Sequence, residues 1–178
     1  MESEAGDTVL VGLGANLGDA ARALRTAAAA LTELGGGPRR VRASSLWRSE
    51  PVDCPPGSPP FLNAAVAFPA PHGTTPEALL GMLQALERDQ GRRRDGLPNA
   101  PRTLDLDLLA FGPRRRDTAE LALPHPRATA RAFVLAPCAE VAPNFPWPGT
   151  ERTVAGLLAA LPAPLGVERL GPLRPEAP

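Results

Sequence analysis

Lysine is absent from the sequence, so all 19 basic residues are arginines, and 19 acidic residues balance them. Without lysine the chain cannot contain the phosphate-binding loop GxxxxGK(S/T), which requires that residue. The formal net charge of zero also excludes a general electrostatic attraction to nucleic acid or to an anionic membrane. Any site that binds an anion must therefore be built locally.

Cysteine and long apolar runs are also scarce. The two cysteines, Cys54 and Cys138, are too few for the disulfide framework of a small secreted domain. Together with His72 and His125 they lack the spacing of a zinc site. No apolar run approaches the ~20 residues of a membrane-spanning helix, and the acidic first residues are unlike a signal peptide. We expect a soluble, cytoplasmic protein that binds no membrane.

The length and composition suit one folded unit. A chain of 178 residues, 43% of them hydrophobic, can bury a full core without a second domain. We predict a single domain over residues 1–178, with its core at about 8–161 and a loosely held, proline-rich tail after Leu161. We expect this domain to be a monomer.

Hydrophobic periodicity predicts the order β-α-β-β-α-β. Apolar and β-branched runs indicate strands, and apolar spacing of i, i+4 behind capping residues indicates helices. The expected strands are 8–13, 41–47, 61–68 and 104–111, and the expected helices run from Asp19 to Gly35 and from Thr75 to about Gln90. This order predicts an α+β fold with a ferredoxin-like βαββαβ core, in which helices pack on both faces of an antiparallel sheet.

Two irregular loops and two short helices complete this prediction. Residues 50–60 are crowded with proline and glycine, and residues 92–102 are rich in arginine. Loops of this length are often functional. The short helices are expected at 131–138 and 154–161.

Three glycines accompany the end of the first predicted strand in the pattern Gly12-x-Gly14-x-x-x-Gly18. The spacing departs from the dinucleotide-binding pattern GxGxxG, and no βαβ unit follows it. We interpret the three glycines as a turn.

Two aspartates share one face of the last predicted strand of the core. The strand period of two places Leu104, Leu106 and Leu108 on the core side and Asp105 and Asp107 on the other, roughly 7 Å apart. Aspartate is disfavoured in strands and like charges repel, so the pair favours a bound cation. Mg²⁺ prefers such oxygen ligands. On their own, the aspartates would rather indicate an exposed edge strand.

Arginines precede this pair. Arg92, Arg93, Arg94 and Arg102 supply guanidinium groups that can bind phosphate oxygens in bidentate fashion. A solvated basic loop would explain the arginines alone, but beside two aspartates they favour phosphoryl transfer, which needs metal ions, cations and a positioned acceptor. His125 lies between two prolines, which can direct its imidazole toward a phosphate.

Four collinear segments resemble the 6-hydroxymethyl-7,8-dihydropterin pyrophosphokinase family across residues 9–143. The most specific is PRTLDLD at 101–107, preceded by QGR at 90–92. The others are GLGANLGD at 12–19, FLNAAV at 61–66, and LPHPR at 123–127 followed by RAFVL at 131–135. The resemblance implies transfer of pyrophosphate from ATP to 6-hydroxymethyl-7,8-dihydropterin, giving AMP and the pterin diphosphate, in folate biosynthesis.

The resemblance also implies roles for individual residues. Asp105 and Asp107 would ligate two Mg²⁺ ions and would form the catalytic set with Arg92 and Arg102. ATP would be the co-substrate, bound by Gln84, Glu87, Arg92, Arg94, Arg102, Leu108, His125 and Arg131. The pterin would be bound by a polar edge and two stacking rings, supplied by Ser49, Val52, Phe61, Asn63 and Phe133.

Departures from the family pattern leave an inactive relative open as an alternative. Asn99 and Ala100 stand where an aromatic residue and glycine are usual, and Glu120 and Ala122 stand where some relatives have basic or hydroxyl residues. An RNA-binding module is a second alternative, because ferredoxin-like sheets also bind RNA. Such a sheet would present aromatic residues rather than aspartates, so we expect no nucleic-acid partner.

Overall fold

The computed structural model describes residues 7–91 and 101–174. Its strands are β1 (Thr8–Ala15), β2 (Arg42–Ala43), β3 (Ser45–Ser49), β4 (Phe61–Pro69), β5 (Asp105–Phe111), β6 (Arg116–Asp117), β7 (Ala122–Leu123) and β8 (Val167–Pro172). Its helices are α1 (Ala20–Leu34), α2 (Pro76–Asp89), α3 (Ala132–Val141) and α4 (Val154–Ala159), with a 3-10 turn at Ala128–Ala130.

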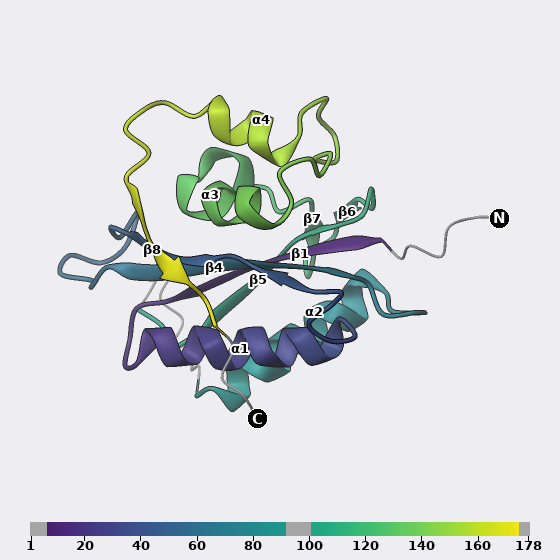
Figure 1. Cartoon of the computed structure of the whole chain (residues 1–178), viewed down its shortest axis with the longest axis horizontal. Coiled ribbons are helices and arrows are strands. Elements are labelled where there is room, and N and C mark those ends of the chain that lie inside the picture. Colours follow the sequence, from purple (N-terminus) through teal and green to yellow (C-terminus); the bar gives the residue numbers. More distant parts are fainter. Residues whose placement is uncertain (1–6, 92–100, 175–178) are drawn as a thin grey trace.

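The centre of the fold is an antiparallel six-stranded sheet. Its strand order is β5-β1-β4-β3-β8, and β2 pairs with β4 beside β3. Helices α1 and α2 lie on one face of the sheet, and α3 and α4 lie on the other (Figure 1). The predicted antiparallel sheet and its helices are confirmed, and β5 is left as one edge of the sheet.

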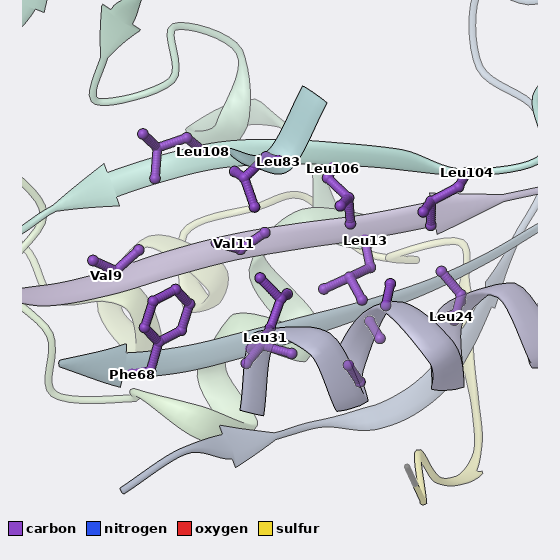
Figure 2. Close-up of a cluster of buried hydrophobic side chains, with 14 of the residues drawn as sticks. Val9, Val11, Leu13, Leu24, Leu31, Phe68, Leu83, Leu104, Leu106 and Leu108 are labelled. Carbon is purple, nitrogen blue, oxygen red and sulfur yellow. The ribbon is translucent and has the colours of Figure 1, made fainter. Parts of the chain in front are cut away.

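Strand alternation divides the apolar residues between two cores. Val9, Val11 and Leu13 of β1 pack toward α1 and α2, together with leucines of β5 and with Leu24, Leu31 and Leu83 from the helices (Figure 2). Leu10 points to the other face and packs under α3 and α4. The prediction that Leu104, Leu106 and Leu108 face the core is confirmed, since all three are buried in the first cluster.

The predicted helix starts are confirmed by their caps. The Asp19 carboxylate accepts a hydrogen bond from the Arg22 N–H at 3.0 Å, and the Thr75 hydroxyl accepts one from the Ala78 N–H at 3.2 Å. Side-chain oxygens in this position satisfy backbone donors that have no partner within the first turn. No helix in the described part of the chain is long and apolar enough to cross a bilayer.

Two expectations about the strands were wrong, and one strand pair was not expected. The first strand continues to Ala15, so Gly12 and Gly14 lie within β1 rather than in a turn, and only Gly18 has the positive φ of a turn residue. The second strand is divided at Ser44, whose hydroxyl accepts the Ala65 N–H and interrupts regular pairing. The short β6–β7 ribbon was not predicted.

The tail after Leu161 is not loosely held as expected. Residues 167–172 form β8, which pairs antiparallel with β3 and adds an edge to the sheet. Leu173 is buried in the core on the α1 side. The Glu140 carboxylate of α3 accepts hydrogen bonds from the Ser45 N–H and from Arg169 of β8. Backbone pairing and this ion pair hold a segment whose proline content suggested the opposite.

Candidate active site

A cavity of about 430 Å³ opens over the β5 edge of the sheet, between the β1–β4 face, the start of α3 and the side of α2. Every predicted site residue within the described chain lines it: Ser49, Val52, Phe61, Asn63, Gln84, Glu87, Arg102, Asp105, Asp107, Leu108, His125, Arg131 and Phe133. Arg92 and Arg94, with Asn99 and Ala100, lie outside the described residues. Residues from distant parts of the sequence thus meet in one place.

The floor of the cavity is a row of paired residues across three strands. Gly14 of β1 pairs with Asp105 of β5 on one side and with Asn63 of β4 on the other, and Gly12 pairs with Asp107. Residues in register point to the same face. The Asp105 and Asp107 carboxylates therefore lie on the β5 side of the two glycines, and the Asn63 amide lies on the β4 side. Asp105 and Asn63 are roughly 10 Å apart, which is two strand spacings.

Arg102 connects the acidic side of the cavity to its aromatic side. Its guanidinium donates to the Asp105 carboxylate at 2.5 Å, and its Cζ lies 6.0 Å from the centre of the Phe61 ring. On the opposite wall, the Arg131 Cζ lies 5.4 Å from the centre of the Phe133 ring. Cations at such distances are attracted to ring faces, so each aromatic residue has an arginine beside it.

Asn63 is fixed by hydrogen bonds that determine which of its atoms faces the cavity. Its Nδ2 donates to the Trp47 carbonyl at 3.3 Å and to the Ser49 hydroxyl at 2.9 Å. Because the carbonyl can only accept, the amide nitrogen must face it. The Oδ1 atom lies on the Gly14 side and presents an acceptor to the cavity.

Asn16, which the sequence analysis named only within the GLGANLGD segment, joins three segments around the cavity. Its backbone N–H donates to the Arg102 carbonyl at 3.1 Å, and its Oδ1 accepts the Arg102 N–H at 2.9 Å. Its Nδ2 donates to the Pro59 carbonyl at 3.1 Å. The side chain is buried, so it fixes the end of β1, the 50–60 loop and the approach to β5 relative to one another.

His125 is held as a neutral imidazole. Burial lowers its pKa most, the nearby Arg131 and Arg127 lower it further, and Asp105 opposes the shift. Its Nδ1 accepts the Arg127 N–H at 3.3 Å, so in the neutral ring the proton resides on Nε2. Burial, followed by repulsion from Arg127, also lowers the pKa of Arg131, although a guanidinium stays charged at neutral pH.

Glu87 lies on the α2 side of the cavity but is almost fully buried, at 2% exposed. Its Oε1 accepts the Leu106 N–H at 2.8 Å, at the outer edge of β5. The residue therefore covers a strand edge as well as lining the cavity. Leu108 is similar, because it lines the cavity while its side chain belongs to the core.

Several lining residues were missed by the sequence interpretation. Gly12 and Gly14 were assigned to a turn, and Arg127 was noted only as part of the LPHPR segment. The glycine signal was available, because a glycine inside a strand often marks a close approach of a ligand. No local sequence pattern marks the exposed Arg127 as a cavity residue, because its neighbours in space come from other elements.

Solved structures titled HPPK-DHPS have a similar fold. The structures titled Plasmodium falciparum HPPK-DHPS, as a triple mutant with pteroate and as wild type with SDX-DHP, each superpose with a TM-score of 0.64 at 12% and 13% identity. The match covers 89% of this chain and 44–45% of those chains. The chain thus spans less than half the length of these structures, and the likeness concerns the fold.

Two sequence relatives match over most of their own length. The protein named 2-amino-4-hydroxy-6-hydroxymethyldihydropteridine pyrophosphokinase from Pseudomonas aeruginosa is 42% identical over 162 residues, 91% of this chain and 96% of that protein. The protein of the same name from Synechocystis is 38% identical over 174 residues, 94% of this chain and 86% of its own.

The model of one family matches most of the chain. It is described as 7,8-dihydro-6-hydroxymethylpterin-pyrophosphokinase (HPPK), and it matches residues 10–143. This range contains the cavity residues from Gly12 to Val134. The chain therefore belongs to the 7,8-dihydro-6-hydroxymethylpterin-pyrophosphokinase family.

Proposed function

We propose that this chain transfers pyrophosphate from ATP to 6-hydroxymethyl-7,8-dihydropterin, giving AMP and the pterin diphosphate, in folate biosynthesis. Family membership and the names of its relatives support a pyrophosphokinase. The observation that carries the proposal is the floor of the cavity, where Asp105 and Asn63 flank Gly14 in register. A metal-binding side and a side that binds a flat ring thus meet in one cavity.

The pterin belongs on the Asn63 side. The Phe61 and Phe133 rings line the same cavity and are the stacking pair for a flat heterocycle. The Asn63 Oδ1 accepts an N–H from the ring edge, and Ser49 holds that amide in place. Val52, in the 50–60 loop, lines the same cavity.

The ATP phosphates belong on the Asp105 side. Carboxylate oxygens on one strand face are the donors that Mg²⁺ prefers, so Asp105 and Asp107 fit two Mg²⁺ ions. When bound, the ions neutralise charge on the phosphate oxygens. Arg102, Arg131 and the Nε2–H of His125 bind the phosphates as well. The proposal also includes Arg92 and Arg94 here, and Gln84, Glu87 and Leu108 on the nucleotide side.

The reaction is a displacement at the β-phosphorus of ATP. The pterin hydroxymethyl oxygen forms a bond to the β-phosphorus while the bond from the β-phosphorus to the α,β-bridging oxygen breaks. AMP leaves with the bridging oxygen, and the hydroxyl proton is released. The residues of this chain act by holding the two substrates in line and by stabilising charge, which are the main catalytic terms in phosphoryl transfer.

We also propose a fold, a domain organisation and a cellular location for the whole chain. The strand order β5-β1-β4-β3 supports a ferredoxin-like βαββαβ core, extended by β8 and by α3 and α4. We take residues 1–178 as one domain that acts as a monomer in the cytoplasm on small molecules, without nucleic acid or membrane.

An assay of AMP release tests the proposal. Purified protein is incubated with ATP, Mg²⁺ and 6-hydroxymethyl-7,8-dihydropterin, and AMP is measured with and without the pterin and with a chelator. We expect AMP only when the pterin and Mg²⁺ are both present. Folded protein that releases no AMP would favour the inactive relative, and release of ADP would contradict pyrophosphoryl transfer.

A further inference from the structure

Gly14 occupies a position where glycine has a cost. It lies inside β1, which is hydrogen-bonded on both sides to β4 and β5. Glycine in a strand interior gives up more conformational freedom on folding than other residues and supplies no side chain to pack. Its φ is outside the positive range found at Gly18 and at the turn glycines. The backbone conformation therefore does not require glycine.

The neighbours of Gly14 do not require glycine either. A Cβ built on Gly14 meets one group, the Asn63 Oδ1, at 3.7 Å, which is ordinary van der Waals contact. By contrast, a Cβ on Gly12 would lie 3.3 Å from Leu109, and one on Gly35 would lie 2.5 Å from Val41. A side chain at Gly35 would clash with its neighbours, and one at Gly12 would require the Leu109 side chain to shift. Neither applies at Gly14.

A side chain at position 14 would enter the cavity. Gly14 lines the cavity, half-buried, between the carboxylate of Asp105 and the amide of Asn63. The proposed pterin binds Asn63 through one edge of its ring, and its hydroxymethyl group has to extend toward the phosphates held near Asp105. The straight path between these two residues crosses Gly14.

We propose that Gly14 is a substrate-positioning residue for the pterin, because its missing side chain leaves the cavity floor flat where the hydroxymethyl-bearing edge of the ring passes toward the phosphates. The inference rests on the proposed assignment of Asn63 to the pterin and Asp105 to the metal-bound phosphates. A methyl group at this position separates the acceptor oxygen from the β-phosphorus and leaves the nucleotide half of the cavity unchanged.

The test is the Gly14→Ala variant, with Gly81→Ala as a matched control. Gly81 is an exposed residue of α2, and a Cβ there meets nothing within 4 Å. Both variants are assayed for AMP formation over a range of 6-hydroxymethyl-7,8-dihydropterin and ATP concentrations, and their thermal midpoints are measured. For Gly14→Ala we expect kcat/KM for the pterin to fall at least about tenfold. Its KM for ATP should stay within about twofold and its thermal midpoint should not fall, while Gly81→Ala should keep parental kinetics.

Each other result overturns the inference. Unchanged pterin kinetics in Gly14→Ala would show that the floor has room for a methyl group. A lower thermal midpoint would show that the fold, and not the ligand, needs glycine. A selective rise in the KM for ATP would place the nucleotide over Gly14. If the unmodified chain forms no pterin-dependent AMP, the proposed function itself fails, and this outcome is distinguishable because it does not involve the variant.

Discussion

Asp107 reaches the cavity because strand alternation directs it there. Its neighbours Leu106 and Leu108 are buried on the opposite face of β5, and a shift of register by one residue would place both leucines in solvent. The core thus fixes the direction of the carboxylate. This coupling makes the aspartate replaceable without loss of the fold, since its own side chain contributes nothing to the apolar cluster.

Asp107→Ala should abolish turnover and leave the protein folded. Stabilisation by a bound metal is worth several kcal/mol and each ~1.4 kcal/mol changes a rate tenfold, so we expect kcat to fall at least about 1,000-fold. Steady-state AMP formation measures the effect, and far-UV circular dichroism monitors the fold. Glu33→Ala, which removes an exposed carboxylate from α1, serves as the control. A loss of helix and sheet signal in Asp107→Ala would instead assign the residue a structural role.

The segments around the cavity are connected by side chains as well as by the sheet. Asn16 follows β1 and binds both the segment before β5 and the 50–60 loop before β4. Strand β4 begins at Phe61, two residues after Pro59, and the Arg102 guanidinium donates a hydrogen bond to the Asp105 carboxylate. The positions of the proposed stacking ring, Phe61, and of the proposed phosphate-binding Arg102 therefore depend on one buried amide.

Asn16→Ala should weaken both the fold and the reaction. Two side-chain hydrogen bonds are lost and the Arg102 N–H loses its partner, at a cost of about 1–3 kcal/mol in the free energy of unfolding. We expect kcat to fall more than the KM for ATP rises, because the groups move rather than disappear. Urea denaturation and AMP kinetics measure the two effects, and Asn16→Asp, which keeps the acceptor for Arg102, should lose less stability. Parental kinetics in Asn16→Ala would contradict a positioning role.

The edge strand β8 shows a second kind of connection. It pairs with β3, and Arg169 reaches Glu140 on α3, which also accepts the Ser45 N–H. Burial alone would raise the pKa of Glu140, but the Ser45 N–H and Arg169 outweigh it, so this pKa lies below its usual value. The carboxylate therefore joins α3, β3 and β8 at neutral pH.

Stability of the whole molecule should depend on pH through His125. Burial, Arg131 and Arg127 lower its pKa in the folded chain, whereas in the unfolded chain it is about 6.5. The unfolded state then binds more protons as the pH falls below about 6.5, and the free energy of unfolding decreases. Well above that pH, from about pH 7, the imidazole is largely neutral in both states and contributes little pH dependence.

His125→Gln should remove this part of the pH dependence. We expect the difference in free energy of unfolding between the variant and the parent to be constant above about pH 7 and to shift in favour of the variant between about pH 6.5 and 5.5. Urea denaturation across this range measures it. The window lies above the lowered pKa of Glu140, so that group does not interfere. Parallel curves for the two proteins would contradict the prediction.

Local features of the sequence specified the main helices and strands and much of the candidate site. Strong periodicity and capping residues specified α1 and α2, and alternation in LDLDL specified which face of β5 holds the leucines. These features are local, because they depend on residues within one or two turns or on a strand period of two. The proposed site residues likewise came from short segments that resemble one family.

The pairing of segments that are distant in the sequence followed from the tertiary structure. The glycines at 12 and 14 resemble a turn in sequence and became a cavity floor because β4 and β5 flank them. The tail resembled a loose end until β3 supplied backbone partners for β8. Asn16 acquired its role from Pro59 and Arg102, which are 43 and 86 residues away. Such contacts depend on pairing between segments that are far apart in the chain, and this pairing leaves no local periodic pattern in the sequence.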